Sequence, residues 1–208
     1  CTGLINVTIP DKVETLGQDV FEGCTQLTSI NIPKSVKSMG AGMFGYCDAL
    51  TCITFEPGSN LTYVATNGSW ELFTNTSSEL KVYCEPGLKS KLSGRGVPDE
   101  RIITTVDVTL VDGDTITPKK IAYGANIAAL GTPTKQGYTF TGWYTDADCK
   151  TRYPDAQLFT NFNGIKLYAG WAGSDLTVKN GTISVVASDG TPLAIELKNG
   201  KAKVPAGA

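Results

Sequence analysis

The sequence predicts an α+β fold that is mainly β, built from a repeat solenoid, a small β-rich module and a short β appendage. A fixed period near the N-terminus predicts the solenoid. Alternating aromatic residues near the middle of the 208-residue chain predict the strands of the second part. Asn-Gly and Asp-Gly dipeptides between short apolar runs predict hairpins in the last part. We therefore divide the chain into residues 1–103, 104–172 and 173–208.

The repeat is clearest in the ten residues CTQLTSINIP at positions 24–33. Related copies begin at Cys1 and Cys47, so the period is 23 residues. Each copy carries the apolar kernel L-x-x-I-x-I, which is typical of a leucine-rich-repeat solenoid. One unit is too small to bury its own apolar face, so successive units are expected to stack in a right-handed array.

Each unit is expected to contribute one short strand to a parallel sheet. Leu27, Ile30 and Ile32 should point inward from this strand. Pro33 should end the pairing, because proline has no N–H to donate. Gly40 is expected to supply a turn with a positive φ.

The third unit is longer, because Phe-Glu-Pro-Gly at residue 55 recurs as Cys-Glu-Pro-Gly at residue 84, an offset of 29. The added residues lie around Trp70. Residues 80–84 are expected to form the last strand, and residues 87–92 a terminal helix that covers the end of the stack. An aromatic spine is expected from Phe21, Phe44 and Phe73.

The pattern C-x-x-L-x-x-I-x-I-P, followed by Val, Gly and Phe, resembles the BspA-like leucine-rich repeats of bacterial surface proteins. The resemblance covers roughly residues 1–95. It departs from the standard leucine-rich repeat at Ser35, where that pattern has Asn. Residues 1–103 are thus expected to be BspA-like repeats with a C-terminal cap.

The middle part begins with an alternating strand at residues 106–111, a turn around Gly113 and a short strand at residues 121–123. A brief helix is expected from Asn126 to residue 130. The run P-T-x-x-G-Y-T-F-x-G-W-Y and the closing L-Y-A-x-W resemble the Listeria–Bacteroides repeat, also known as the internalin B-repeat. That resemblance implies a small β-grasp-like fold at residues 104–172. Residues 173–208 are expected to be a β-hairpin appendage or a truncated β-sandwich module.

The composition excludes several classes of site. The net charge of −2 offers no basic patch for nucleic acid, and no apolar run is long enough to span a bilayer. The absence of histidine removes Ser-His and Cys-His nucleophile pairs, and no C-x-x-C is present. The chain opens inside a repeat without Met, so we expect a fragment of a longer protein. No cofactor is predicted.

Two groups of residues, one of cysteines and one of aspartates, each have a chemical and a structural interpretation. Cys1, Cys24 and Cys47 share one repeat position and predict a buried ladder of free thiols rather than a disulfide framework. Asp146 and Asp148, with Asp155 nearby, could hold calcium, but they lack the Gly and Glu of an EF-hand loop. A solvated turn is the favoured interpretation. Asp112 and Asp114, which flank Gly113, are interpreted as turn residues rather than as an acid/base pair.

The outward positions of the repeat strands form the candidate partner-binding site. An extended sheet of this kind is the surface that repeat proteins use for binding, and a plain solvated sheet is the alternative. The candidate residues are Trp70, Lys81, Tyr83, Asn31 and Thr54.

The two resemblances together imply a non-catalytic fragment of an extracellular, bacterial cell-surface protein. Its expected role is adhesion or the binding of a protein or glycan ligand on the host or the matrix. One alternative is a structural spacer in a large surface protein. Another is an accessory region of a secreted hydrolase whose catalytic domain lies outside the fragment.

Overall fold

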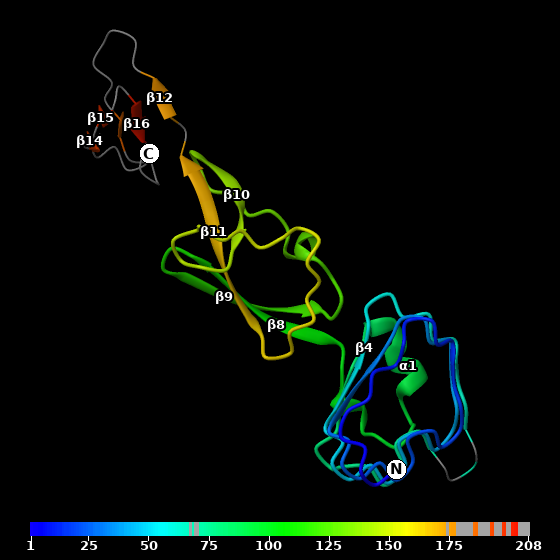
Figure 1. Ribbon diagram of the computed structural model, residues 1–208. Coiled ribbons are helices and arrows are strands. Elements are labelled where there is room, and N and C mark those ends of the chain that lie inside the picture. The colour runs from blue at the N-terminus through cyan, green and yellow to red at the C-terminus, as the bar shows by residue number, and fades with distance from the viewer. Residues whose placement is uncertain are drawn as a thin grey trace. The chain divides into compact units, whose positions relative to one another are not determined.

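The computed structural model describes residues 1–66, 68 and 71–173, together with the backbone of five short strands beyond residue 173. The fold is mainly β, as the sequence predicts. The chain divides into two compact units (Figure 1). The first unit comprises Cys1–Val106, Lys120–Asn126 and Leu158–Phe162. The second comprises Asp107–Lys119, Ile127–Gln157 and Asn163–Ala208.

The first unit is organised around a parallel sheet with the strand order β2-β4-β6-β7. Its strands are β2 (Ser29–Ile32), β4 (Cys52–Phe55), β6 (Lys81–Tyr83) and β7 (Ile102–Ile103). We call it the repeat sheet. Leu27, Ile30 and Ile32 are buried, which confirms the predicted inward face. The parallel register places Ile30 beside Ile53, and Ile53 beside Val82, so each repeat adds one rung to the same apolar core.

A second parallel sheet runs along the other side of the repeats. It has the order β1-β3-β5, with β1 at Thr15–Leu16, β3 at Ser38–Met39 and β5 at Tyr63–Val64. Gly40 follows β3, and the expectation of a positive φ there is wrong, because Gly40 is not among the residues with that conformation. A Cβ on Gly40 would instead collide with the backbone of Gln18 in the preceding repeat. Gly40 therefore serves close stacking, not a left-handed turn.

The predicted aromatic spine is confirmed. The ring of Phe44 stacks on Phe21 at a centroid distance of 5.7 Å and on Phe73 at 5.9 Å. Phe44 and Phe73 are fully buried. The residues around Phe44 form a series of turns. Aromatic stacking at one repeat position thus links three successive units through the core.

All six cysteines are free in the structure. Cys24 and Cys47 are buried in the core, and the Sγ of Cys47 donates to the carbonyl oxygen of Phe21 at 3.1 Å. Cys1 is exposed, so its expected place in the buried ladder is wrong. Residues 1–3 are all exposed, so this copy of the repeat does not bury its cysteine as the next two copies do. Burial raises the pKa of Cys47 to about 11 and that of Cys84 to about 12.

The C-terminal end of the repeats is closed by short helices. These are η1 (Pro86–Leu88), α1 (Lys89–Leu92) and η2 (Asp99–Arg101), and the predicted terminal helix is confirmed at residues 86–92. Leu88 and Leu92 are buried against the core.

The prediction that residues 80–84 form the last strand is wrong, because β7 pairs in parallel with β6. Ile102 continues the buried row one rung further.

The second unit contains a four-stranded sheet with the order β10-β11-β8-β9. Its strands are β8 (Thr105–Asp112), β9 (Thr115–Ala122), β10 (Tyr138–Tyr144) and β11 (Ile165–Gly173). The first two residues of β8 and the last three of β9 are assigned to the first unit. The turn at Gly113 is confirmed, and Gly113 has a φ of 56°. The short strand expected at residues 121–123 is the end of the longer β9. The brief helix is confirmed as the 3-10 helix η3 (Ile127–Leu130).

Strand β10 is irregular at Gly142. The antiparallel register with β11 shifts between Phe140 and Gly142, which marks a β-bulge. Gly142 has a φ of 135°, and it lies opposite Gly170 on β11. A Cβ on Gly170 would overlap the ring of Tyr144, so both strands need glycine at this crossing.

The last part of the chain has five short strands whose backbone is described. They are β12 (Asp175–Thr177), β13 (Val185–Val186), β14 (Pro192–Leu193), β15 (Leu197–Lys198) and β16 (Lys201–Lys203). Strands β15 and β16 pair antiparallel with Lys198 opposite Lys201, as expected for strands that flank Asn-Gly. The hairpin predicted around Asn180 lies outside the described residues.

Candidate partner-binding face

The register of the repeat sheet brings four of the five candidate residues together. Asn31 lies beside Thr54, and Thr54 beside Tyr83, in one row across β2, β4 and β6. Lys81 ends the neighbouring row, which begins at Ser29 and continues through Cys52. We call these side chains the outer face: Ser29, Asn31, Cys52, Thr54, Lys81 and Tyr83. Their alternation with the buried residues follows from the twofold period of a strand.

Hydrogen bonds between repeats hold the outer face in place. The hydroxyl of Thr54 donates to Oδ1 of Asn31 at 2.9 Å, and Nδ2 of Asn31 donates to Oε1 of Glu56 at 3.1 Å. The other oxygen of Glu56 accepts from the backbone N–H of Lys34 at 3.2 Å. Glu85, at the same place in the next Glu-Pro-Gly, accepts from the N–H of Gly58 at 2.8 Å. Each glutamate therefore reaches back one repeat and satisfies a turn.

Tyr83 is not exposed, and this corrects the expectation from the sequence. Its ring stacks on Phe162 at a centroid distance of 4.5 Å, and only 8% of Tyr83 is accessible. Burial, and to a lesser extent the nearby Cys52, raise the pKa of its hydroxyl. Tyr83 points outward as the alternation requires, but Phe162 from a distant part of the chain covers it. The exposed part of the outer face is thus Ser29, Asn31 and Lys81, with Thr54 half-buried.

Two residues of this region were missed by the sequence analysis, namely Phe162 and Tyr123. Tyr123 is buried, and its N–H donates to the carbonyl oxygen of Thr104 at 2.9 Å. Burial raises the pKa of Tyr123 to about 12. No local signal identifies either residue, because both lie in a part of the sequence with no repeat period. Only the structure shows that they belong to the unit that carries the repeat sheet.

Trp70, the fifth candidate, lies outside the described residues. Its neighbour in the longer third repeat, Tyr63, is described and is exposed on β5. Tyr63 belongs to the sheet β1-β3-β5 and therefore not to the outer face of the repeat sheet. An exposed tyrosine on that second sheet was not predicted as part of a site.

The acidic residues considered for calcium form a turn with internal partners. The two oxygens of Asp146 accept from the N–H groups of Lys150 at 3.0 Å and Thr151 at 2.7 Å, and these bonds lower its pKa. Asp148 forms an ion pair with the side chain of Lys150 at 2.8 Å. Asp155 pairs with Arg152 at 3.1 Å. These partners support the interpretation as a solvated turn.

The described part of the chain contains no group of three His, Cys, Asp or Glu side chains that could hold a metal ion. Within the same residues, no helix has the length and apolar character needed to cross a membrane. The thiols of Cys47 and Cys84 are buried and have raised pKa values, which disfavours the nucleophilic thiolate.

Two family descriptions match the chain. Residues 1–88 match the BspA type leucine-rich repeat region, in six copies. Residues 104–170 match the Listeria-Bacteroides repeat domain. These matches confirm both resemblances, in the predicted order. Such repeats are typical of bacterial surface proteins that interact with other proteins, and the families are typically non-catalytic.

Proposed function

We propose that this protein, in which BspA type leucine-rich repeats precede a Listeria-Bacteroides repeat domain, binds a protein or glycan ligand at a bacterial cell surface. The binding region is the exposed part of the outer face, and the role is adhesion to host or matrix. In this proposal the repeats form a solenoid, and the second unit is a β-grasp-like module that extends the chain. The protein itself is non-catalytic and extracellular.

The observation that carries the proposal is the rigid row of polar side chains on the repeat sheet. Asn31 is bonded both to Thr54 and to Glu56, so the side chains of this row are held in place before a partner arrives. Preorganised side chains lose less conformational entropy on binding than mobile ones. Lys81 adds a positive charge at the end of the neighbouring row, and no ion pair involving it is found among the described residues.

A structural spacer is the second candidate, and one observation favours it. Interfaces depend on buried Tyr, Trp and Arg anchors, and Phe162 already covers the one tyrosine of the outer face. A spacer needs the stacked core but no exposed anchor. A third hypothesis is an accessory region of a secreted hydrolase. The sequence of the complete gene product tests it, because a catalytic domain would have to be present elsewhere in that sequence.

A binding screen separates recognition from spacing. The 208-residue chain would be immobilised and tested against purified extracellular-matrix proteins and cell-wall glycans. Each ligand that binds would be retested with Asn31→Ala, Thr54→Ala and Lys81→Ala, keeping variants whose melting is unchanged. We expect at least one of these variants to weaken binding by about tenfold, which corresponds to roughly 1.4 kcal/mol. Thr15→Ala, on the other sheet, is the matched control.

The outcomes of the screen point to different conclusions. Binding that survives all three variants places the site on another part of the chain. An equal loss with the Thr15→Ala control would show a general effect on the fold rather than a site. The absence of binding to every ligand would leave the spacer as the better description.

A further inference from the structure

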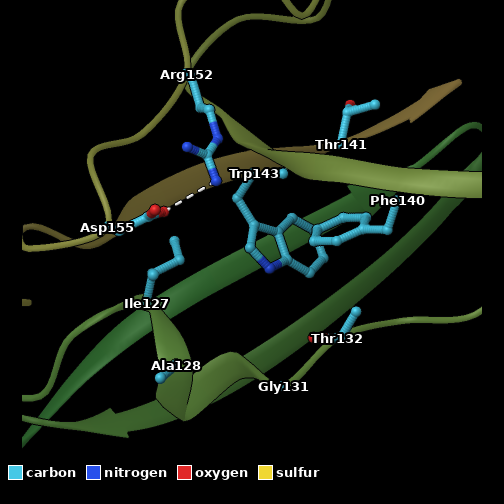
Figure 2. Close-up of a pocket in the computed structure, with 10 residues that line it drawn as sticks. Ile127, Ala128, Gly131, Thr132, Phe140, Thr141, Trp143, Arg152 and Asp155 are labelled. Carbon is cyan, nitrogen blue, oxygen red and sulfur yellow. Dashed lines mark ion pairs between the residues drawn. The ribbon is translucent and has the colours of Figure 1, made fainter.

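A cleft in the second unit is not used by the proposed function. It has a volume of about 420 Å³ and lies between strand β10 and helix η3. Figure 2 shows Phe140 and Trp143 on the β10 side, Ile127 and Gly131 on the other side, and the pair Arg152–Asp155 at one end. The volume falls within the range of ordinary ligand sites, about 300–1,000 Å³.

The cleft contains a buried donor without an acceptor. Trp143 is only 6% exposed, and its indole Nε1 has no hydrogen-bond partner. In Figure 2 the indole nitrogen points toward the side of the cleft formed by the Ile127–Leu130 helix and Gly131. The other tryptophan of this sheet, Trp171, donates from Nε1 to Asp112 at 2.9 Å. Because buried donors are nearly always paired in folded proteins, the free N–H of Trp143 indicates a place for an acceptor.

The main chain beside the cleft is also unpaired. Strand β10 is the end strand of its sheet, so only its β11 side is paired along its length. On the outer side, Tyr138 bonds to Lys135, and the other end is closed by bonds from Tyr153 to Trp143 and from Thr145 to Thr151. Between these points, within the described residues, the outer main-chain groups of residues 139–142 have no hydrogen bond.

The charges at the cleft are already balanced. Arg152 and Asp155 form an ion pair at 3.1 Å, and the rest of the lining carries no charge. Gly142 makes this arrangement possible, because a Cβ there would lie 2.6 Å from Nε of Arg152. The cleft therefore offers no free counter-ion to a charged ligand. An uncharged ligand fits it best.

We propose that the cleft receives an extended peptide segment that pairs with the outer edge of β10 as an added strand. Main-chain groups of the peptide bond to the open edge, an uncharged aliphatic side chain fills the cleft, and a carbonyl oxygen accepts from Trp143. Addition of a strand to an open sheet edge is an established mode of peptide recognition. A sugar fits less well, because stacking needs an open aromatic face and Trp143 is almost fully buried.

The proposal is tested on the full 208-residue chain with capped hexapeptides. Their sequences alternate Thr with one uncharged residue, taken in turn from Val, Ile, Leu, Met and Ala. We expect at least one peptide to bind, and binding to slow hydrogen exchange by about tenfold at those amides of residues 139–142 that point away from β11. The same peptide, N-methylated at alternate residues, should bind at least tenfold more weakly, because it lacks the N–H groups of a strand.

Two variants and two controls complete the experiment. Trp143→Phe removes the indole N–H, and Ile127→Trp fills the cleft while Trp143 stays in place. Each should weaken peptide binding by at least tenfold with melting retained. Ile116→Lys, on the other edge strand β9, and Lys81→Ala, on the repeat sheet, should leave it unchanged.

The proposal is overturned if no peptide of the set binds at millimolar concentration, or if the N-methylated peptide binds equally well. It is also overturned if both cleft variants bind normally, or if a short cell-wall oligosaccharide protects the same amides and no peptide does. Lys81 belongs to the outer face of the repeat sheet and not to the cleft. The adhesion proposal can therefore fail in the binding screen while peptide binding to the cleft is still observed.

Discussion

At the scale of single residues, the core of the repeats depends on side chains that recur at one position. Phe44 is the central example, because it is fully buried and stacks on both Phe21 and Phe73. We expect Phe44→Ala to lower the free energy of unfolding by about 3–5 kcal/mol, the range for aromatic deletions in cores. Denaturant unfolding monitored by circular dichroism measures the change. Val20→Ala, at a position 48% exposed, is the control. A loss below about 1 kcal/mol for Phe44→Ala would contradict the spine.

The cysteines provide a second test at this scale. Burial raises the pKa of Cys47 to about 11 and that of Cys84 to about 12, so both thiols are protonated at pH 8. Because the thiolate is the reactive form, iodoacetamide should label the exposed Cys1 first and leave these two unlabelled in the native protein. Mass spectrometry counts the labels. Under denaturing, non-reducing conditions all six cysteines should react, and a mass deficit from a bridge would refute the free-thiol assignment.

At the scale of elements, the close stacking of successive repeats explains why position 40 is a glycine. A turn with a positive φ does not explain it, because Gly40 does not have that conformation. Gly17 and Gly40 occupy the same position in successive repeats, but only Gly40 meets the backbone of the preceding repeat. We expect Gly40→Ala to destabilise the protein by roughly 1–3 kcal/mol, as overpacking does. Gly17→Ala has open space around the new methyl group and should have little effect. Equal melting temperatures for the two variants would contradict the packing argument.

Repeat spacing identified Ile30, Ile32 and Phe44 as core residues, because a fixed period reports which side chains share one environment. The same spacing could not identify Phe162 as the cover of Tyr83, because that contact joins distant residues without a common period. It also missed β7, since the two residues Ile102 and Ile103 are too few to show alternation.

The candidate site was predicted in part for the same reason. The twofold period of a strand placed Asn31, Thr54 and Lys81 on one face, and the register puts Thr54 beside Asn31, with Lys81 at the end of the neighbouring row. The hydrogen bond between Asn31 and Thr54 depends on side-chain rotamers, which no spacing reports. The unpaired N–H of Trp143 depends on packing within the second unit and was likewise out of reach of the sequence.

At the scale of the whole molecule, the division into modules remains a prediction. All of the four-stranded sheet β10-β11-β8-β9 except its last residue, Gly173, lies within residues 104–172. We therefore expect a fragment of residues 101–172 to melt cooperatively, as measured by differential scanning calorimetry. A fragment that shows no transition would mean that this part depends on the repeats. In that case the contact between Tyr83 and Phe162 would be the first to examine.

The outer face of the repeat sheet is proposed to be the surface that contacts a partner. A photo-crosslinking amino acid placed at Thr54 tests it most directly, with the same amino acid at Thr15 on the other sheet as the control. Each protein would be irradiated with the purified ligand that binds best in the screen. The proposal predicts that adducts form from position 54 and not from position 15. Adducts from position 15 alone, or equal yields from both positions, would contradict it.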